Sequence, residues 1–572
     1  MKIIGIVCIG PDPSVCVMDN GKILSMVEEE RITRIKHANV DFPKEAFKFC
    51  LNQSGLTIEE IDVITYPWEA SKFSSGYIQK FYDSITQVYD KDNRTLEWEK
   101  EQLKTFNEDA LRRMILYNVK NLYPKVNNLP EVVFTPHHFS HAFQSYFMSK
   151  MKKSLIFTID GSGDENCTVI WKCESNQLTK LKEYNIPHSL GWFYAAFTEF
   201  LGFKAYDGEY KVMGLAAYGT YDEKLINKVN QVLSYDVNGN YEVNPYFIFY
   251  GEHTYSGRYT DKMVELFGEP NVSQSVNSYT KNLAFAIQFH LEEVCSRQAK
   301  YWVKKTGIRN ICLGGGVAMN VKMAGRLRRE DFIDQVFIPY CSSDLGLSLG
   351  SAMVHSKNSG ITLDTNLDSP FWGPSFSNDF IEDILKECKL KYRKVENVSD
   401  IVAKLLTEQK IVGWFQGRGE VGARALGSRS ILADPRKVEN KDRVNKVVKQ
   451  RELWRPFCPS ILEDSAIDYF KSCTQSPYMT MTFHSIRKTE DKIPAVVHTD
   501  KTVRPQTVNK TQNEMYYRML NKFYELTGVP AVLNTSFNVK GEPIVHHPLD
   551  AIRCFYSNGL DVLAIGNFIL EK

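Results

Sequence analysis

Three histidines lie close together in the stretch "FTPHHFSHAFQSYF" (134–147). His137 and His141 are four residues apart, so a helix through this stretch would place both imidazoles on one face. Two imidazoles so placed can chelate one divalent transition metal. Such residues are also common as polar side chains where a loop enters a helix, here expected near Ser140. The spacing alone leaves both interpretations open, and it separates His138 from the pair.

A carboxylate elsewhere in the chain could complete such a metal site. Asp344, in "PYCSSDLGLSLG", follows a predicted strand and precedes a helix-like run. It is a candidate third ligand beside His137 and His141, although an aspartate at this position could also cap the helix. Fe(II), Co(II), Mn(II) and Zn(II) all accept two imidazoles and a carboxylate, so the sequence does not identify the metal.

Two glycine-rich turns follow apolar strands, "DGSGD" (160–164) and "LGGGVAMN" (313–320). Turns of this kind expose several backbone N–H groups, which suit phosphate groups and let a nucleotide approach closely. A single glycine turn is more typical of a tight connection without a ligand. Two of them in one α/β domain indicate nucleotide binding.

The second half of the chain is rich in arginine within glycine-containing loops, in "GRGEVGARALGSRS" and "KQRELWRPF". Arginine in such loops typically binds phosphate or carboxylate through its planar guanidinium, and the alternative is a solvated charged surface. The interleaving with Gly, Trp and Phe favours an anion site. "NTSFN" (534–538) follows an apolar strand and offers hydroxyl and amide groups as a further wall, or else forms a helix cap or an Asx turn.

These motifs lie on alternating strands and helices. The chain is expected to begin with strands turned at Asp19–Gly21 and to continue in strand–turn–helix units to about residue 360. Residues 72–127 are predicted to form a helical insertion, and the composition of residues 358–379 indicates a linker. A second α/β unit begins near 410, and no internal repeat is evident in the sequence.

Composition excludes several classes of protein. Hydrophobic residues make up 43% of the chain and charged residues 24%, with a net charge of +2. There is no clustered basic excess of the kind that nucleic acid or an anionic membrane requires, and no apolar run long enough to span a bilayer. The 12 cysteines include no Cys-x-x-Cys pair. We therefore expect a reduced, cytoplasmic protein whose first residues form a buried strand rather than a signal peptide.

A set of longer motifs resembles a known family. These are "EEERITRIKHANVDFP", "HHFSHA", "PHSLGWFYAAFTEFLGFKAYDGEYKVMGLAAYG", "LGGGVAMN", "GWFQGRGEVGARALGSRSILADPR", "KQRELWRPFCPS", "RPQTV" and "LNTSFNVKGEPIV". Together, and in this order, they are similar to the O-carbamoyltransferases of nodulation-factor and antibiotic biosynthesis. The resemblance runs over residues 1–572.

The resemblance implies an α/β protein of two domains. Residues 1–365 would form an actin/Hsp70-like (ASKHA) carbamoyl-transfer domain, and residues 366–572 a YrdC-like domain that makes carbamoyl-adenylate from carbamoyl phosphate and ATP. The first domain would then pass the carbamoyl group to a hydroxyl of a small natural-product or sugar acceptor. ATP would enter with Mg, a bound divalent metal of the Fe(II) type would assist, and a homodimer is compatible with the family.

The resemblance also assigns site residues by motif. The implied metal ligands are His137, His141 and Asp344. The implied catalytic residues are Lys36, Asp12, Lys449 and Arg504. The implied substrate-binding residues are Arg418, Arg424, Arg429, Asn534 and Ser536. The nucleotide side is implied to include Asp160, Gly161, Gly314, Gly315, Gly316 and Asn320.

The sequence departs from the family at one position. Members usually carry a His-Asp pair in the loop after the first strand, whereas this chain has Pro11 followed by Asp12. Asp12 could take over the role of the missing histidine, the acceptor could be unusual, or transfer could be impaired. Two alternatives to carbamoyl transfer therefore stay open, a tRNA-modifying enzyme of the threonylcarbamoyl type and a nucleotide-binding homologue without transfer activity. The near-neutral charge argues against tRNA.

Overall fold

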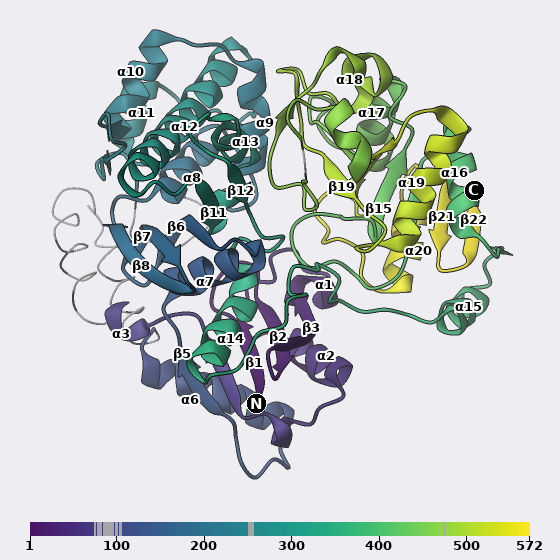
Figure 1. Cartoon of the computed structure of the whole chain (residues 1–572), viewed down its shortest axis with the longest axis horizontal. Coiled ribbons are helices and arrows are strands. Elements are labelled where there is room, and N and C mark those ends of the chain that lie inside the picture. The colour runs from purple at the N-terminus through teal and green to yellow at the C-terminus, as the bar shows by residue number, and fades with distance from the viewer. Residues whose placement is uncertain are drawn as a thin grey trace. The chain divides into compact units, whose positions relative to one another are not determined.

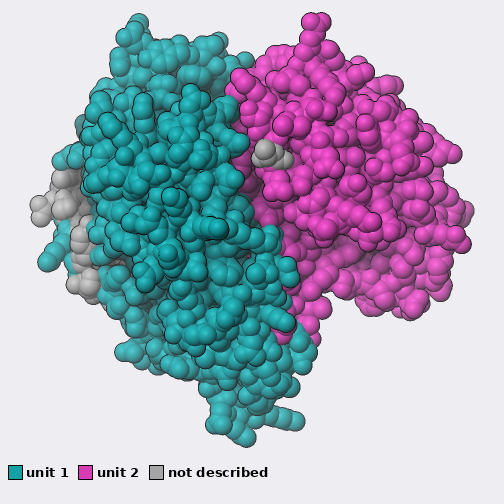
Figure 2. Space-filling view, viewed as in Figure 1, with its two compact units in different colours: residues 1–23, 40–47, 54–368 teal, residues 24–39, 48–53, 369–572 magenta. Residues whose placement is uncertain are grey.

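We describe the protein from a computed structural model (Figure 1). The structure describes residues 1–73, 106–249, 257–473 and 475–572, together with isolated positions between 74 and 105. Within these residues the helices include none that combines the length and apolar character needed to cross a bilayer. The chain divides into two compact units, coloured separately in Figure 2.

Unit 1 comprises residues 1–23, 40–47 and 54–368. Its first sheet has the strand order β3-β2-β1-β4-β5. The strands are β1 (Lys2–Val7), β2 (Ser14–Asp19), β3 (Lys22–Glu28), β4 (Val63–Tyr66) and β5 (Glu131–Phe134). The predicted hairpin is confirmed: Asn20 and Gly21 join β2 to β3 with φ of 46° and 79°, the left-handed conformation that a tight two-residue turn needs.

The second sheet of unit 1 repeats the topology of the first. Its order is β12-β11-β6-β7-β8, from β6 (Lys153–Gly163), β7 (Asn166–Glu174), β8 (Gln177–Asn185), β11 (Asn310–Gly314) and β12 (Gln335–Phe337). In each sheet the central strand pairs antiparallel on one side and parallel on the other. This duplicated sheet is the architecture of the actin/Hsp70-like fold. The sequence shows no repeat because topology is preserved here without similar residues.

Helices of unit 1 cover these sheets and position the histidines. The longer ones are α6 (Glu108–Leu122), α7 (His137–Ser149), α8 (Leu190–Phe200), α9 (Glu209–Leu215), α10 (Glu223–Val232), α11 (Asp261–Phe267), α12 (Ser278–Thr306), α13 (Val321–Arg329) and α14 (Leu347–Asn358). Helix α2 (Lys44–Ser54) has residues in both units. Helix α14 packs on β1, α7 packs on β6 and β11, and α7 and α14 contact each other. Gly5 permits this packing, since a Cβ there would lie 1.7 Å from the carbonyl oxygen of Ser348.

Unit 2 comprises residues 24–39, 48–53 and 369–572 and is built on one mixed eight-stranded sheet. Its order is β13-β22-β21-β14-β15-β20-β16-β19, from β13 (Arg393–Lys394), β14 (Val412–Phe415), β15 (Arg429–Ala433), β16 (Cys458–Leu462), β19 (Gln506–Val508), β20 (Ala531–Ser536), β21 (Val562–Ile565) and β22 (Phe568–Glu571). Its helices are α1 (Glu29–Thr33), α15 (Asn378–Glu387), α16 (Val398–Thr407), α17 (Glu439–Arg443), α18 (Arg487–Lys492), α19 (Glu514–Thr527) and α20 (Pro548–Tyr556). The predicted α/β class is confirmed in both units.

The units are not simply the two halves of the chain. The main division falls after Asp368, next to the predicted boundary at 365/366. However, 24–39 and 48–53 were expected in the first domain and are grouped with unit 2. Much of the predicted insertion at 72–127 lies outside the described residues, and α6 is its helical part that the structure describes.

Candidate active site

Four side chains of unit 1 converge from three places in the sequence. His137 and His141 lie one turn apart on α7, Asp160 lies on β6, and Asp344 begins the short 3-10 helix Asp344–Gly346. The Nε2 atom of His141 is 3.2 Å from Oδ2 of Asp160 and 3.4 Å from Oδ1 of Asp344. The corresponding distances from Nε2 of His137 are 3.8 and 3.6 Å. We call these four residues the His/Asp cluster.

The His/Asp cluster has the donor atoms and the spacing of a metal site. One ligand atom from each residue lies within 4.8 Å of the others. Both ring nitrogens of His137 and of His141 are buried without a hydrogen bond, as is Oδ1 of Asp344. Buried polar atoms are nearly always satisfied, so this group of unsatisfied atoms indicates a partner that binds between them. Two imidazoles and two carboxylates fit a divalent transition metal.

Neighbouring residues fix the orientation of His137. The carboxylate of Asp164 accepts hydrogen bonds from the backbone N–H of His137 (3.0 Å) and of Glu69 (2.7 Å). The ring of Trp68 lies edge-on to His137, with centroids 4.8 Å apart. Gly163 lets the imidazole approach the strand, because a Cβ there would lie 2.1 Å from its Cδ2 atom. Asp164 thus caps α7 from a distant loop, so the helix begins at His137 instead of near Ser140 as expected.

Burial and neighbouring charges shift the pKa values of several side chains in and beside the His/Asp cluster. Burial opposes protonation of His141, but Asp160 and Asp344 outweigh it and raise its pKa to about 9. Burial and then the charge of Asp160 raise the pKa of Asp344. His138 behaves differently: burial, followed by the two neighbouring histidines, lowers its pKa to about 3. Its ring nitrogens contact Oγ1 of Thr158 and the carbonyl oxygen of Asn166, so it is anchored away from the cluster.

Asp160 connects the His/Asp cluster to the glycine turns. Its Oδ2 accepts a hydrogen bond from the N–H of Gly316 (3.0 Å), and its Oδ1 accepts one from the N–H of Gly161 (2.8 Å). Gly315 has φ of 90°, and a Cβ there would lie 2.3 Å from the carbonyl oxygen of Ile159. Asp160 was expected on the nucleotide side, and its proximity to the histidines escaped the sequence analysis.

The remaining predicted nucleotide residues surround the end of β11. Gly314 ends that strand, and the 3-10 helix Gly316–Met319 follows directly. Asn320 is the N-cap of α13, where its Oδ1 accepts from the N–H of Met323 (3.0 Å). Its amide also exchanges hydrogen bonds with the side-chain amide of Gln288, each of 2.9 Å. Asn320 therefore braces α13 against α12.

The two family-implied catalytic residues from the N-terminal region fall in different units. Asp12 lies in the loop after β1 in unit 1, next to Pro11, half-buried and with φ of 59°. Lys36 lies in unit 2, in the segment after α1. Its positive charge helps to lower the pKa of Lys449, another predicted residue of unit 2.

Lys449 is a buried lysine held by a cradle of oxygen atoms. Its Nζ donates to the carbonyl oxygen (2.9 Å) and hydroxyl (3.2 Å) of Ser536. It also donates to the carbonyl oxygen of Asn538 (2.9 Å) and to the Oδ1 atom of that residue. Burial, followed by the charges of neighbouring Arg451, Arg455 and Lys36, lowers the pKa of Lys449 well below its ordinary value. A bound anion would reverse this and favour the ammonium.

Two arginines of the glycine-rich motif "GRGEVGARALGSRS" donate hydrogen bonds from their guanidinium groups to backbone carbonyls. Arg429 is 1% exposed and donates to the carbonyl oxygens of Gln416, Ser428, Pro374 and Gly417 at 2.8–3.1 Å. It also lies 3.7 Å above the ring of Phe415. Burial lowers its pKa to about 10. Arg418 donates to the carbonyl oxygens of Gly373, Leu24 and Trp372. Arg424, the third, is half-buried.

Glu420 organises the same loop and was missed by the sequence analysis. Its buried Oε1 accepts hydrogen bonds from the N–H groups of Leu426, Ser428 and Arg429, the shortest being 2.7 Å. Residues 24–39 also hold this loop. Glu28 accepts a hydrogen bond from the N–H of Gly422 (2.7 Å), and Arg31 donates one to the carbonyl oxygen of Gly422 (2.6 Å). The motif at 28–43 therefore holds the loop of unit 2 in place.

Asn534 and Arg504 lie on neighbouring strands of the same sheet or beside them. The Nδ2 atom of Asn534 donates to the carbonyl of Ala425 (3.1 Å) and to the hydroxyl of Ser460 (2.9 Å), while its Oδ1 is buried without a partner. Arg504 donates from Nε to the sulfur of Cys458 (2.9 Å). Asn534 lies on β20, the strand that ends at Ser536, and Arg504 contacts Cys458 of the neighbouring β16, which pairs with Asn534.

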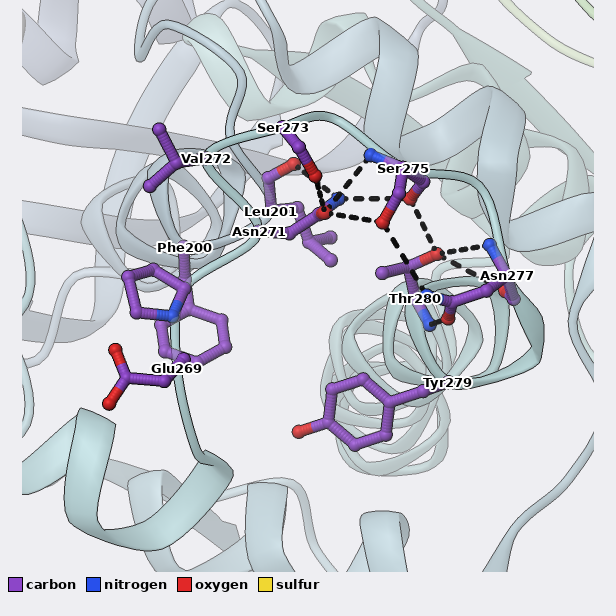
Figure 3. Close-up of a pocket in the computed structure, with 11 residues that line it drawn as sticks. Phe200, Leu201, Glu269, Asn271, Val272, Ser273, Ser275, Asn277, Tyr279 and Thr280 are labelled. Atoms are coloured by element: carbon purple, nitrogen blue, oxygen red, sulfur yellow. Dashed lines mark hydrogen bonds between the residues drawn. The ribbon is translucent and has the colours of Figure 1, made fainter.

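A separate pocket of unit 1, of about 310 Å³, contains none of the predicted residues (Figure 3). It lies between the end of α8, residues 269–275 and the start of α12. Asn271 closes its polar side, where its Oδ1 accepts from the N–H (3.0 Å) and hydroxyl (2.8 Å) of Ser275. These bonds satisfy the side-chain oxygen of Asn271 within the loop itself.

Comparison with known proteins gives a consistent result. A family model described as carbamoyltransferase N-terminus matches residues 2–353, and one described as carbamoyltransferase C-terminus matches residues 403–572. The chain is 33% identical to the uncharacterized protein sll1178 of Synechocystis sp., covering 100% of this chain and 96% of that protein. It is 31% identical to the nodulation protein NolNO of Sinorhizobium fredii, covering 98% and 79%. Among solved structures, HypF of T. kodakarensis aligns over 63% of this chain and 48% of its own, at 12% identity and a TM-score of 0.30.

Proposed function

The chain belongs to the carbamoyltransferase family, and on that premise we propose that it is an ATP-dependent O-carbamoyltransferase acting on a small hydroxylated acceptor. The observation that carries this proposal is the cradle of Lys449 in unit 2. A buried lysine there donates to Ser536 and Asn538, and no carboxylate of the described residues forms an ion pair with it. Such a site suits an anionic substrate, for which we propose carbamoyl phosphate and ATP.

The proposed reaction in unit 2 has two steps. Water cleaves carbamoyl phosphate to carbamate and phosphate, and the carbamate oxygen then attacks the α-phosphorus of ATP, forming carbamoyl-adenylate and releasing pyrophosphate. Lys449 would be charged once phosphate enters and would stabilise the negative charge that accumulates in this displacement. Ser536 and Asn538 keep its Nζ in place. Arg504 and Asn534, beside the same strands, are proposed to bind the carbamoyl and phosphate groups.

Transfer is proposed to occur in unit 1, where the acceptor hydroxyl attacks the carbamoyl carbon of the adenylate and AMP leaves. The His/Asp cluster would hold a divalent metal, Fe(II) by family resemblance, and a bound cation supplies Lewis acidity to phosphate and acceptor oxygens. His137, His141, Asp160 and Asp344 provide its ligands. Asp164 holds His137 at the start of α7, and the N–H groups of Gly161 and Gly316 orient Asp160.

The test uses carbamoyl phosphate labelled in its carbonyl carbon. Incubation with ATP, Mg and the purified chain should release pyrophosphate and yield labelled carbamoyl-adenylate, and Lys449→Ala should abolish both. The matched control is Lys446→Ala, which removes a nearby lysine that makes no hydrogen bond to the cradle. Absence of pyrophosphate with every divalent metal tried would refute the proposal.

A further inference from the structure

Arg258 is a buried arginine whose guanidinium forms no ion pair with any carboxylate that the structure describes. Its side chain is 0% exposed, and Nη2 donates to the hydroxyl of Tyr206 at 2.6 Å. Its Nε and Nη1 atoms have no hydrogen-bond partner. Glu199 is the adjacent carboxylate, but it accepts from the backbone N–H of Arg258 (2.6 Å) rather than from the guanidinium.

This arrangement differs from that of Arg429 in the same chain. Arg429 is almost equally buried and its Nε also lacks a partner, yet its two Nη atoms donate to four backbone carbonyls. Among the described residues, the guanidinium of Arg258 makes one hydrogen bond, to Tyr206. Removing a guanidinium from water is costly unless hydrogen bonds or an opposite charge compensate for it. The environment of Arg258 is therefore incomplete without an anion.

Aromatic rings hold Arg258 in a defined place. Its guanidinium carbon is 5.6 Å from the ring centroid of Trp192 and 5.3 Å from that of Tyr206. Tyr206 has φ of 64°, a strained conformation for an aromatic residue, and the Oε1 atom of Glu209 stabilises it by accepting from its N–H (2.8 Å). Strain that is maintained in this way is typical of binding sites.

The same residues lead directly to the His/Asp cluster. Trp192 packs on Gly161, where a Cβ would lie 2.8 Å from the indole Nε1. Ser189, the N-cap of α8, donates from its hydroxyl to the carbonyl oxygen of Gly161 at 2.6 Å. Gly161 follows Asp160, a member of the cluster. Arg258 is thus separated from the glycine turn by one side chain.

We infer that Arg258 supplies the cation of an oxyanion-binding site beside the His/Asp cluster, which binds a phosphate group of the molecule held at the glycine turns. This inference deepens the proposed function and rests on it. A planar guanidinium next to a metal site is well suited to phosphate. The phosphate has two possible sources, the nucleotide and an acceptor or product that carries phosphate, and the experiment separates them.

The test measures binding of ATP and of inorganic phosphate by calorimetry, with metal present. Unit 2 also binds anions in our proposal, so the full-length Lys449→Ala variant serves as parent. Adding Arg258→Gln should weaken binding roughly ten- to hundredfold, since a hydrogen bond to a charged group contributes about 1.5–3 kcal/mol. The control is Arg326→Gln, because Arg326 is already paired with Glu293 (2.5 Å) and should not affect phosphate.

The outcomes are distinct. Weaker binding of ATP alone assigns the site to the nucleotide, and weaker binding of inorganic phosphate assigns it to a free or acceptor phosphate. Unchanged affinity for both probes overturns the inference. If Arg258→Gln does not fold, Arg258→Lys keeps the charge without the planar group, and phosphate should then raise its melting temperature less than that of the parent. An equal rise would also overturn the inference. Because neither probe requires turnover, failure of carbamoyl transfer would not mimic these results.

Discussion

The His/Asp cluster of unit 1 and the arginine loop of unit 2 both bury charge, but they satisfy it differently. In the cluster the ring nitrogens of His137 and His141 lack hydrogen bonds although four donor atoms converge. In the loop Arg429 and Arg418 donate to backbone carbonyls of their own unit. The converging donor atoms of the cluster therefore call for a ligand, whereas most guanidinium N–H groups of Arg429 are already satisfied by backbone carbonyls, its Nε being the exception. In unit 2 the chemistry falls instead to Lys449 and its cradle.

The largest effect that would test this contrast is on metal binding. His141→Ala removes one ligand of four, and we expect metal affinity to fall by more than about a hundredfold, since loss of even an outer partner costs 10–100-fold. His138→Ala is the matched control because His138 lies on the same helix and bonds elsewhere. Elemental analysis of both purified variants checks this. Equal metal content in the two would exclude His141 as a ligand.

A second pair of variants separates chemistry from stability in unit 2. Arg429→Gln leaves several buried carbonyls without donors, so the free energy of unfolding should drop by about 2–4 kcal/mol. Lys449→Ala should instead reduce pyrophosphate release by roughly a hundredfold or more, as expected for loss of charge stabilisation. Denaturant titration and pyrophosphate release are measured on both. If Arg429→Gln were fully stable but unable to bind carbamoyl phosphate, Arg429 would be a substrate ligand, as the family resemblance implies.

A smaller effect concerns the cap of α7. Asp164→Asn places an amide where a carboxylate now accepts from the N–H groups of His137 and Glu69, and we expect metal affinity to fall about tenfold. Asp222→Asn is a close control, since Asp222 also accepts two N–H groups, at the start of α10. The absorption spectrum of bound Co(II) reports ligand geometry directly. An identical spectrum and affinity in Asp164→Asn would show that the cap does not position His137.

The sequence predicted which site residues are close to one another along the chain, but only in part which distant residues join them. The spacing of His137 and His141 follows from helix geometry, and it is confirmed that α7 carries both. Asp160 could not be recognised as their partner, because β6 joins the cluster only through the second sheet. The capping of α7 by Asp164, a loop residue of the β6–β7 connection, was equally invisible, and it moved the helix start to His137.

Similar limits apply to unit 2. Arginines among glycines indicate an anion site by composition, but burial and hydrogen bonding decide their role, and both depend on tertiary packing. Arg429 was expected to bind substrate and lies against backbone carbonyls, while Glu420, which fixes the loop, carried no signal that spacing could reveal. The grouping of residues 24–39 with unit 2 likewise results from packing of Glu28 and Arg31 on Gly422.

The pH dependence of binding distinguishes the two regions by its sign. Asp160 and Asp344 outweigh burial and raise the pKa of His141 to about 9, so the metal-free protein holds a proton there at neutral pH. The stability from this charged His141 is present below its unfolded pKa of about 6.5 and is lost as pH rises through about 9. A metal must displace the proton, so its affinity should rise about tenfold per pH unit up to about pH 9.

Lys449 should respond in the opposite direction. Burial, followed by the charge of Arg451, lowers the pKa of Lys449 well below its ordinary value, so the ammonium form is lost at lower pH and affinity for phosphate should decrease as pH rises. Chelator competition for the metal and calorimetry for phosphate, each at about pH 7 and about pH 8.5, measure both slopes. His138→Ala should keep the slope of metal binding, because His138 has its own partners. Slopes of the same sign for metal and phosphate would contradict the opposite pKa shifts of His141 and Lys449.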